Sequence, residues 1–281
     1  CRLNRALYGV ERSGHDFIES FKDCLISLGW KQSESDPAIM TRKYGRNHCV
    51  MCTYVDDVML SASRQDSVKI WAEIEKHFES GQAEEITKFL GMVVKRDNPK
   101  LMNLYIDQSN YAESIIKNYE KQTNVVIKPR DTPLRVDLKE PIYDDLPLND
   151  AGYARSPVGA ILYLMRSSRP DLAFPVGHLA RGITRWSEYH KGQLEWLLGY
   201  IRKTSSKTLK FQRGKDSWDD LAIECYTDAS WDCPYSTGGY LIALKGIRGT
   251  FLPLSWCSKK ISVICTSSAE SEAIAATAGV K

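Results

Sequence analysis

Hydrophobic residues recur along the first half of the chain with a period that alternates between helical and extended. Residues 13–28 place apolar side chains on one helical face, with Ser13 as the expected N-cap and a glycine directly after. Two apolar extended runs, 48–55 and 58–62, are separated only by an acidic pair, which predicts a tight hairpin. Further helices are expected from Asp66, as a cap, to 78 and over 111–119, and strands over 38–44, 89–94 and 101–106.

The pattern changes after residue 121, where four prolines and an acidic pair interrupt it as a linker would. Helical periodicity returns, and from residue 221 the period becomes two, before a helix that starts at Ser267 or Ser268. The expected helices are 157–164, 171–180 and 187–201, and the expected strands are 221–227, 239–244 and 252–257. These elements predict a mixed α/β (α+β) fold.

Composition narrows the class of protein. The chain has 281 residues, 43% hydrophobic and 26% charged, which is typical of a globular protein of roughly two domains rather than a disordered one. Its net charge of +3 is compatible with a nucleic-acid partner but does not indicate one. No apolar run approaches the roughly 20 residues that span a bilayer, so no membrane partner is expected. The eight scattered cysteines suggest reduced thiols and an intracellular protein.

Cys49 and Cys52 have the spacing of a zinc ligand pair. No second Cys/His pair lies at a finger-like distance, and the two residues between them are apolar. A buried strand is therefore the favoured interpretation.

A basic stretch follows the last predicted helix of the linker region. It is either a solvated surface or a contact for a phosphate backbone. The candidate nucleic-acid-binding residues in it are Lys207, Lys210 and Arg213.

The acidic pair Asp56-Asp57 is the first candidate site for chemistry. Two adjacent carboxylates between apolar strands repel each other unless they are solvated or neutralised by a cation. Mg²⁺ prefers such oxygen ligands, and two metal ions can stabilise both oxygens of a phosphoryl transfer. An ordinary turn is the alternative, because Asp is a common turn residue.

A series of motifs in this order resembles the copia-type LTR retrotransposon Pol polyprotein, which contains a reverse transcriptase and an RNase H. Tyr54-Val55-Asp56-Asp57 resembles the metal-binding motif of reverse transcriptases. The resemblance covers essentially the whole chain. Its other motifs are Leu7-Tyr8-Gly9-Val10, Phe89-Leu90-Gly91, Gln108 with Tyr111, Thr132-Pro133-Leu134 and Arg169-Pro170-Asp171.

The resemblance implies an RNA-directed DNA polymerase with Mg²⁺ or Mn²⁺ as cofactor, and a primer, an RNA template, an RNA–DNA hybrid and dNTPs as partners. Asp56 and Asp57 would be catalytic metal ligands, and Tyr54 and Val55 would lie beside the primer end. The substrate side would include Tyr8, Gly9 and Arg12, where Arg12 replaces a glutamine of many relatives. A further catalytic Asp would precede Cys1.

The resemblance also divides the chain. It implies a partial palm over 1–97, a thumb-like region over 98–135, a linker and helical connection over 136–215, and a truncated RNase H-like domain over 216–281. It places the protein inside the cell, in a cytoplasmic virus-like particle, in the nucleus, or in both.

The last of these regions contains the second candidate site. Asp228, in Thr227-Asp228-Ala229-Ser230, resembles the first-strand metal ligand of RNase H. Glu272 is the preferred helix ligand over Glu270, although both glutamates suit a helix start electrostatically. The remaining ligands would lie beyond Lys281, so negligible nuclease activity is expected.

Two other functions are possible on the sequence alone. A catalytically inactive nucleic-acid-binding remnant of such an element would keep the connection and the basic stretch. An unrelated metal-dependent hydrolase is disfavoured, because no phosphate-binding glycine loop or His-rich cluster occurs.

Overall fold

The protein has a mixed α/β fold with two compact units, residues 1–90 and 91–281. The computed structural model describes residues 12–55, 57–79, 81–97, 103–138, 141, 148, 151–231 and 235–280. None of the helices in these ranges is long and apolar enough to cross a membrane. The four functional regions expected from the sequence stay predictions.

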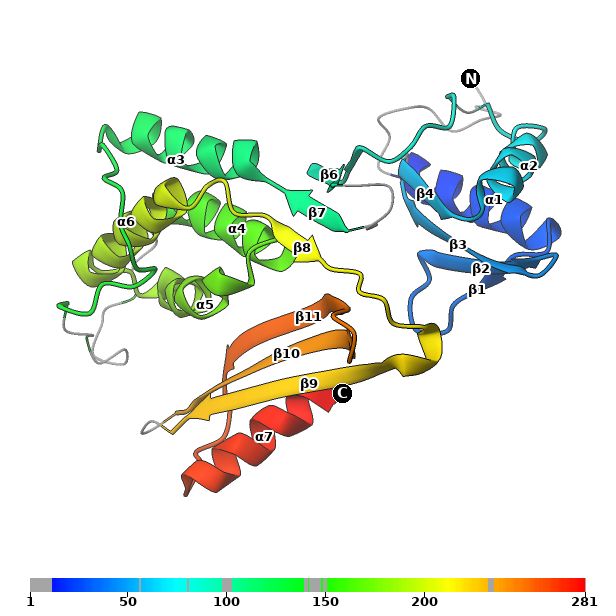
Figure 1. Cartoon of the computed structure of the whole chain (residues 1–281). Helices are drawn as coiled ribbons and strands as arrows, with labels where there is room; N and C mark the ends of the chain where they lie inside the picture. The colour runs from blue at the N-terminus through cyan, green and yellow to red at the C-terminus, as the bar shows by residue number, and fades with distance from the viewer. Residues whose placement is uncertain are drawn as a thin grey trace. The chain divides into compact units, whose positions relative to one another are not determined.

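The first unit is an antiparallel sheet in the order β1-β2-β3-β4 with two helices on one face (Figure 1). Cross-strand neighbours Met40, Met51 and Leu60 point to that face and meet Phe21 and Ile70 of the helices. The elements are α1 (Ser13–Ser27), β1 (Lys31–Gln32), β2 (Ile39–Tyr44), β3 (Asn47–Tyr54), β4 (Asp57–Ser61), α2 (Arg64–Ile74) and β5 (Lys88–Phe89).

The two predicted helix caps of this unit are wrong by position. Arg12, not Ser13, is the N-cap residue of α1, and its side chain makes no capping hydrogen bond. Ser63 caps α2: its Oγ accepts a hydrogen bond from the backbone N–H of Asp66 at 3.2 Å and donates to the Asp66 carboxylate at 2.6 Å. Ser63, three residues before Asp66, thus outcompetes the acid for the cap.

The preference for a buried strand over a zinc site at Cys49 and Cys52 agrees with the structure. Both residues lie on β3, three positions apart, so their side chains point to opposite faces of the sheet. Burial raises the pKa of both thiols, which disfavours the thiolate that a metal requires.

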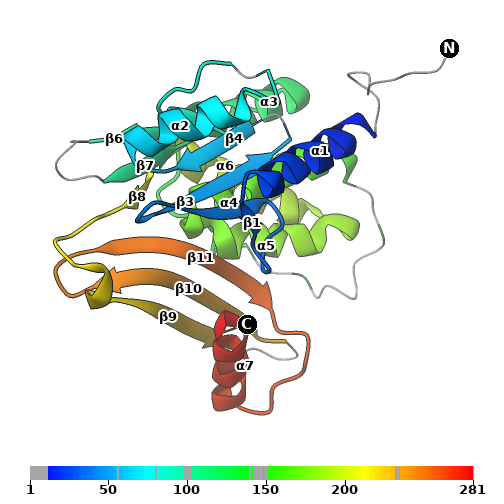
Figure 2. The same ribbon diagram turned by 90° about the vertical axis from the view of Figure 1, so that its right-hand side faces the viewer.

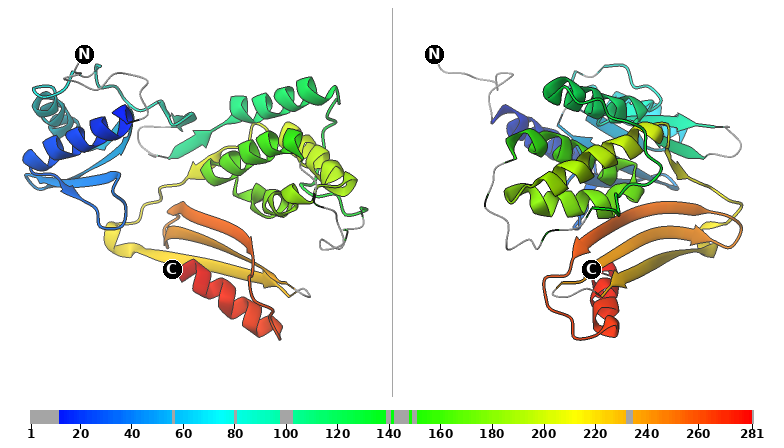
Figure 3. Two further views of the ribbon diagram at one scale, coloured as in Figure 1. Left: turned by 180° about the vertical axis from the view of Figure 1, so that it is seen from behind. Right: turned by 90° about the vertical axis from the view of Figure 1, so that its left-hand side faces the viewer.

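The second unit begins with a small sheet and a helical cluster, seen from behind in Figure 3. Helices α3 to α6 share one hydrophobic core, whose residues include Tyr119, Ile161, Leu179 and Leu197. The elements are β6 (Met92–Arg96), β7 (Leu104–Asp107), α3 (Ser109–Thr123), α4 (Gly152–Ser167), η2 (Pro170–Leu172), α5 (Ala173–Arg181), η3 (Gly182–Thr184), α6 (Glu188–Lys203), β8 (Leu209–Phe211) and η4 (Trp218–Asp220).

A second antiparallel sheet, in the order β11-β10-β9, completes this unit. Its elements are β9 (Leu221–Ser230), β10 (Thr237–Gly246), β11 (Phe251–Lys260) and α7 (Ser268–Val280). Helix α7 covers one face, where Gly279 lies against Cys225 and Thr227 (Figures 1 and 2). On the other face, the indole N–H of Trp256 donates to the carbonyl of Met165 in α4 at 2.9 Å.

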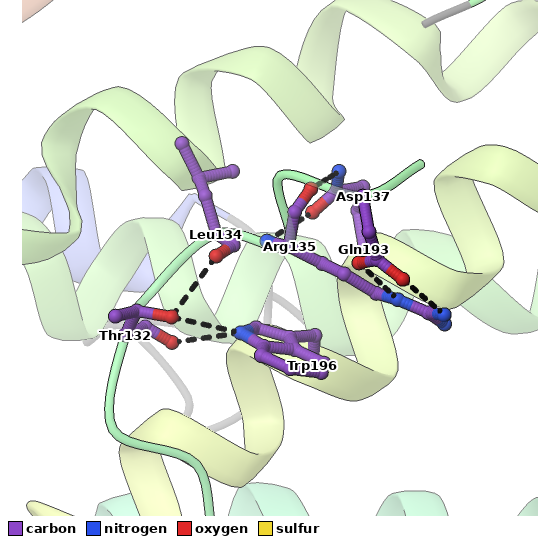
Figure 4. A network of polar contacts seen from close by, with 6 residues as sticks. All are labelled: Thr132, Leu134, Arg135, Asp137, Gln193 and Trp196. Carbon is purple, nitrogen blue, oxygen red and sulfur yellow. Dashed lines mark hydrogen bonds and ion pairs between the residues drawn. The ribbon is translucent and has the colours of Figure 1, made fainter. Parts of the chain in front are cut away.

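Residues 125–137, which we call the strap, run along one side of α6 (Figure 4). The indole N–H of Trp196 donates to the carbonyl of Thr132 at 3.0 Å, and the guanidinium carbon of Arg130 lies 4.2 Å from the centre of its ring. The Gln193 amide accepts from the backbone N–H of Arg135 at 3.0 Å and donates to its carbonyl at 2.7 Å. These side chains satisfy backbone groups that have no partner in a helix or sheet.

Gly199 allows the strap to approach the backbone of α6. The N–H of Arg130 donates to the Gly199 carbonyl at 3.1 Å. A Cβ at position 199 would clash with the Lys128 carbonyl oxygen and would lie 2.6 Å from Cγ of Arg130. The strap therefore packs against a position where only glycine fits.

We predict opposite effects of the same substitution at two helical glycines. Gly199→Ala should lower the free energy of unfolding by about 1–3 kcal/mol, because the new methyl group displaces the strap. Gly159→Ala in α4, where a Cβ would meet nothing within 4 Å, should raise it by about 0.5–1 kcal/mol. Urea unfolding followed by circular dichroism measures both, and equal effects would contradict the role of Gly199.

The buried Arg169 forms an ion pair with the partly exposed Asp171, and it joins the end of α4 to the end of α6. The Arg169 guanidinium bonds both oxygens of Asp171, at 2.9 and 2.8 Å, and donates to the Thr204 carbonyl and hydroxyl at 3.0 and 2.8 Å. The Tyr200 hydroxyl donates to Asp171 at 2.8 Å. Burial opposes the charge on Asp171, but the bonds from Arg169 and Tyr200 hold its pKa below the usual range.

Removal of the arginine should leave the Asp171 charge half-buried without its main partner. We expect Arg169→Met to lower the free energy of unfolding by about 1–3 kcal/mol, because the Thr204 carbonyl and the Asp171 carboxylate lose their hydrogen-bond donor. Arg166→Met, at an exposed position of the same helix end, should change it by less than about 0.5 kcal/mol. The measurement is urea unfolding of the whole chain, and a loss below that of Arg166→Met would refute the anchoring role.

Candidate carboxylate sites

The tight hairpin predicted around the first acidic pair is confirmed, with its turn shifted by one residue. Tyr54 ends β3 and pairs with Asp57, which begins β4, so the turn starts at Val55. Asp57 is therefore a strand residue, because its backbone takes part in the ladder. Asp56 lies outside the described residues, as do Tyr8 and Gly9.

Tyr54 and Asp57 lie on the sheet face that the helices leave open. Side chains alternate along a strand, and Met51 and Thr53 of β3 point toward α1 and α2. Tyr54 therefore points the other way, and its cross-strand partner Asp57 shares that side. Both side chains are exposed, so the carboxylate of Asp57 is accessible from the open face.

Val55 has a left-handed backbone conformation, with φ = 50°. This conformation is unfavourable for a β-branched residue and persists only where the surrounding structure imposes it. A Cγ of Val55 lies 4.0 Å from the Cβ position of Gly14 in the first turn of α1. Val55 also lines a hollow with Phe17 and Phe21 of that helix. Helix α1 therefore supports the turn from the covered side of the sheet.

Arg12 is the N-cap residue of α1, two residues before Gly14, whose Cβ position faces Val55. Its guanidinium is 3.3 Å from the Asp16 carboxylate and is largely exposed. An exposed ion pair of this kind is weak in water, so it leaves the arginine available to a phosphate.

The structure places Asp228 on the face of its sheet opposite to α7. Thr227 lies against α7 at Gly279, and alternation turns Asp228 the other way. Its cross-strand neighbour is Gly239, which has no side chain to cover it. The carboxylate is exposed on this open face.

Glu270 and Glu272 have different roles at the start of α7. The carboxylate of Glu270 accepts hydrogen bonds from the Thr266 N–H at 2.7 Å and the Thr266 hydroxyl at 2.8 Å. These bonds hold the pKa of Glu270 below its usual range. The hydroxyl of Ser267 in turn accepts from the Glu270 N–H at 3.2 Å, which completes a reciprocal cap. Glu272 is exposed.

Asp228 and Glu272 lie toward the same end of the sheet. Helix α7 runs with Gly279 against Cys225 and with Ala275 3.0 Å from the Cβ position of Gly238, the partner of Ala229. Glu272 is almost one turn further in this direction, beyond Ala275. The two acids start from different faces, because α7 covers the face opposite to Asp228. Among the described residues no three His, Cys, Asp or Glu side chains gather as a metal-binding group.

The three basic residues expected to bind nucleic acid have different surroundings. The Lys207 ammonium lies 3.4 Å from the hydroxyl of Tyr200, which is bonded to Asp171 of the ion pair described above. The Lys210 ammonium donates to the Gln212 amide at 2.9 Å, and the backbone of Arg213 is held by Asn103 at 2.9 Å. All three side chains are exposed. Their role in binding stays a prediction.

Two exposed residues near Asp228, Tyr235 and Lys260, were not among the site residues predicted from the sequence. The Lys260 ammonium lies 3.5 Å from the ring centre of Tyr235. Counting alternate positions from Trp256 along the predicted strand would have placed Lys260 on the same face as Asp228. The predicted strand ended at residue 257, so this signal was lost.

A pair of substitutions tests which of the two glutamates at the start of α7 stabilises the helix as a cap. Glu270→Ala should lower the free energy of unfolding by about 0.5–2 kcal/mol, because it removes the reciprocal cap. Glu272→Ala should leave it nearly unchanged, since this side chain is exposed. Urea unfolding measures both. An equal loss for the two variants would show that the cap has no special role.

Comparisons with known proteins agree with the motif series. Residues 1–134 match the family of reverse transcriptases (RNA-dependent DNA polymerases). The chain is 27% identical over 278 residues to the retrovirus-related Pol polyprotein from transposon RE1 of Arabidopsis thaliana, covering 97% of this chain and 18% of that protein. It is also 27% identical over 289 residues to the retrovirus-related Pol polyprotein from transposon TNT 1-94 of Nicotiana tabacum, covering 99% and 21%.

A shorter relative aligns over most of both chains. The putative transposon Ty5-1 protein of Saccharomyces cerevisiae is 27% identical over 283 residues, with 98% of this chain and 87% of that protein covered. The chain spans about a fifth of the length of the two plant polyproteins. The recognition made from the motifs is confirmed: residues 1–134 match the reverse transcriptase family, and nearly the whole chain is similar to retrotransposon Pol polyproteins.

Proposed function

We propose that the chain is the part of a copia-type Pol polyprotein that carries the metal-binding hairpin of an RNA-directed DNA polymerase. Its substrates would be a primer on an RNA template and dNTPs. The proposal also includes the opening of an RNase H-like domain, which begins near residue 216. The observation that carries it is the exposed Asp57 at the tip of an apolar hairpin, within the residues that match the reverse transcriptase family.

The open face of the β1–β4 sheet supports a role in binding a primer end. The helices α1 and α2 fix the sheet from one side, so the backbone at Tyr54 and Asp57 is held in the ladder. Tyr54 offers an aromatic ring beside the carboxylate, on which a sugar or base can pack. Strand residues hold a ligand in place better than a mobile loop does.

Asp57 fits the oxygen chemistry of Mg²⁺ or Mn²⁺. The carboxylate is exposed and begins a strand, so it can accept a cation without breaking an internal hydrogen bond. Asp56, adjacent in sequence, would be the second ligand of this motif. The bound ions would supply electrostatic stabilisation of the attacking and leaving oxygens. The protein itself would orient the primer end through Tyr54, and Arg12 would contact the triphosphate.

The second acidic site supports the RNase H part of the proposal. Asp228 is accessible on the open face of β9, and Glu270 is engaged as a helix cap. Glu272 is therefore the helix acid that is available for a metal ion.

We place both activities inside the cell, where the retrotransposon would replicate in a virus-like particle or in the nucleus.

Primer extension on poly-rA with an oligo-dT primer and Mg²⁺ tests the polymerase proposal. The chain should be expressed within its full reading frame, because it spans about a fifth of its plant relatives. Asp57→Asn and Asp56→Asn should each reduce extension roughly a hundred-fold or more, since each removes a ligand that stabilises the transition state. Asp23→Asn, at an exposed position of α1, should leave extension unchanged.

Two outcomes would contradict the proposal. Full extension by Asp57→Asn would exclude a catalytic role for this carboxylate. Duplex binding without extension in the parent protein would favour the alternative of a catalytically inactive nucleic-acid-binding remnant.

A further inference from the structure

An exposed patch of polar and aromatic side chains lies beside Asp228 on the open face of the β9–β11 sheet. The register aligns Ser230, Thr237 and Lys260 in one row across the three strands. The next row on the same face contains Asp228, Gly239 and Ser258. Alternation puts both rows on the side of Trp256, opposite to α7. We call Tyr235 and Lys260 the end pair of this face.

The end pair presents a cation on an aromatic ring. The Lys260 ammonium lies 3.5 Å from the centre of the Tyr235 ring, and both side chains are exposed. The ring restricts where the long lysine side chain can place its charge. At the other end of the face Lys245 is neutralised, because its ammonium lies 3.0 Å from the Glu224 carboxylate. The positive charge of this face is therefore concentrated at the end pair.

Between Asp228 and the end pair, the surface of the sheet lacks a side chain at Gly239. Gly239 separates Asp228 from Ser258 and has no side chain, so a ligand backbone can approach the sheet closely there. Strand spacing and residue rise place the Cα atoms of Asp228 and Lys260 about 12 Å apart. Phosphates of a duplex follow one another about every 3.4 Å along the axis of each strand. A backbone that passes Asp228 therefore reaches Lys260 within a few nucleotides.

The helical cluster restricts the direction from which a ligand can come. Trp256 of β11 is bonded to Met165 of α4, and the Cβ position of Gly177 in α5 lies 3.4 Å from the Ser258 carbonyl oxygen. The β11 side of the face is thus covered by α4 and α5. The β9 side, with Tyr226 and Asp228, is exposed.

We propose that Tyr235 and Lys260 bind the sugar–phosphate backbone of an RNA–DNA duplex that enters from the β9 side and passes Asp228. This rests on the proposed nucleic-acid function and adds a specific contact to it. Lys260 pairs with a phosphate, and Tyr235 packs against the adjacent sugar or base. The contact positions the strand at Asp228 and takes no part in bond cleavage.

Neighbouring lysines on opposite faces of β11 give a matched test. Lys259 pairs with Gly238 on the α7 side, whereas Lys260 lies on the Asp228 side, and both are exposed. Binding of the whole chain to a fluorescein-labelled RNA–DNA hybrid is measured by anisotropy between 50 and 300 mM KCl, with EDTA present. Lys260→Ala should weaken binding several-fold at 50 mM KCl and reduce the salt slope by about one. Lys259→Ala should match the parent in both.

The variant Asp228→Asn tests independently, in the same binding experiment, whether a phosphate lies beside this carboxylate. Without metal ions the carboxylate repels a phosphate beside it, so its neutralisation should strengthen binding several-fold. Equal losses for the two lysine variants, or unchanged affinity in Asp228→Asn, would overturn the proposal. Circular dichroism confirms that each variant is folded. A parent protein that is expressed within its full reading frame and extends no primer, but whose chain shows the Lys260 effect, would refute the polymerase function and leave this contact standing.

Discussion

In both sheets that carry candidate acids, a helix or helices cover the face opposite to the acid, and strand alternation determines which side chains reach solvent. In the first unit Met40 and Met51 meet α1 and α2, so Tyr54 and Asp57 are left on the open face. In the second unit α7 lies against Cys225, so Asp228 points the other way. A one-residue shift in either strand would exchange the buried and exposed sets.

The apolar and acidic parts of the first site therefore depend on each other. The hairpin must be apolar enough on one side to bind the helices, and its tip must project charge into water. Val55 connects these requirements, because it contacts the start of α1 while its neighbour Tyr54 faces the open side. A turn with its own support holds the carboxylate still, which an ion bound by few ligands requires.

Much of this arrangement could be predicted from the sequence. Periodicity located the helices around Phe21, Tyr119 and Leu197 and the hairpin around Asp57, because each element buries one continuous face. The caps were harder, since Ser13, Ser63 and Asp66 have similar propensities and local hydrogen bonding decides among them. The strap could not be foreseen: Thr132 lies 64 residues before its partner Trp196, and Arg135 lies 58 residues before Gln193, so no local period connects them.

The left-handed conformation of Val55 has a further consequence. A glycine there would remove the steric penalty of a φ of 50°, but it would also give the tip many more accessible backbone states. The carboxylate of Asp57 would then occupy many positions, and a bound cation would have ligands that move. Val55 thus costs the fold some free energy, and in return the turn holds the carboxylate in a more defined position.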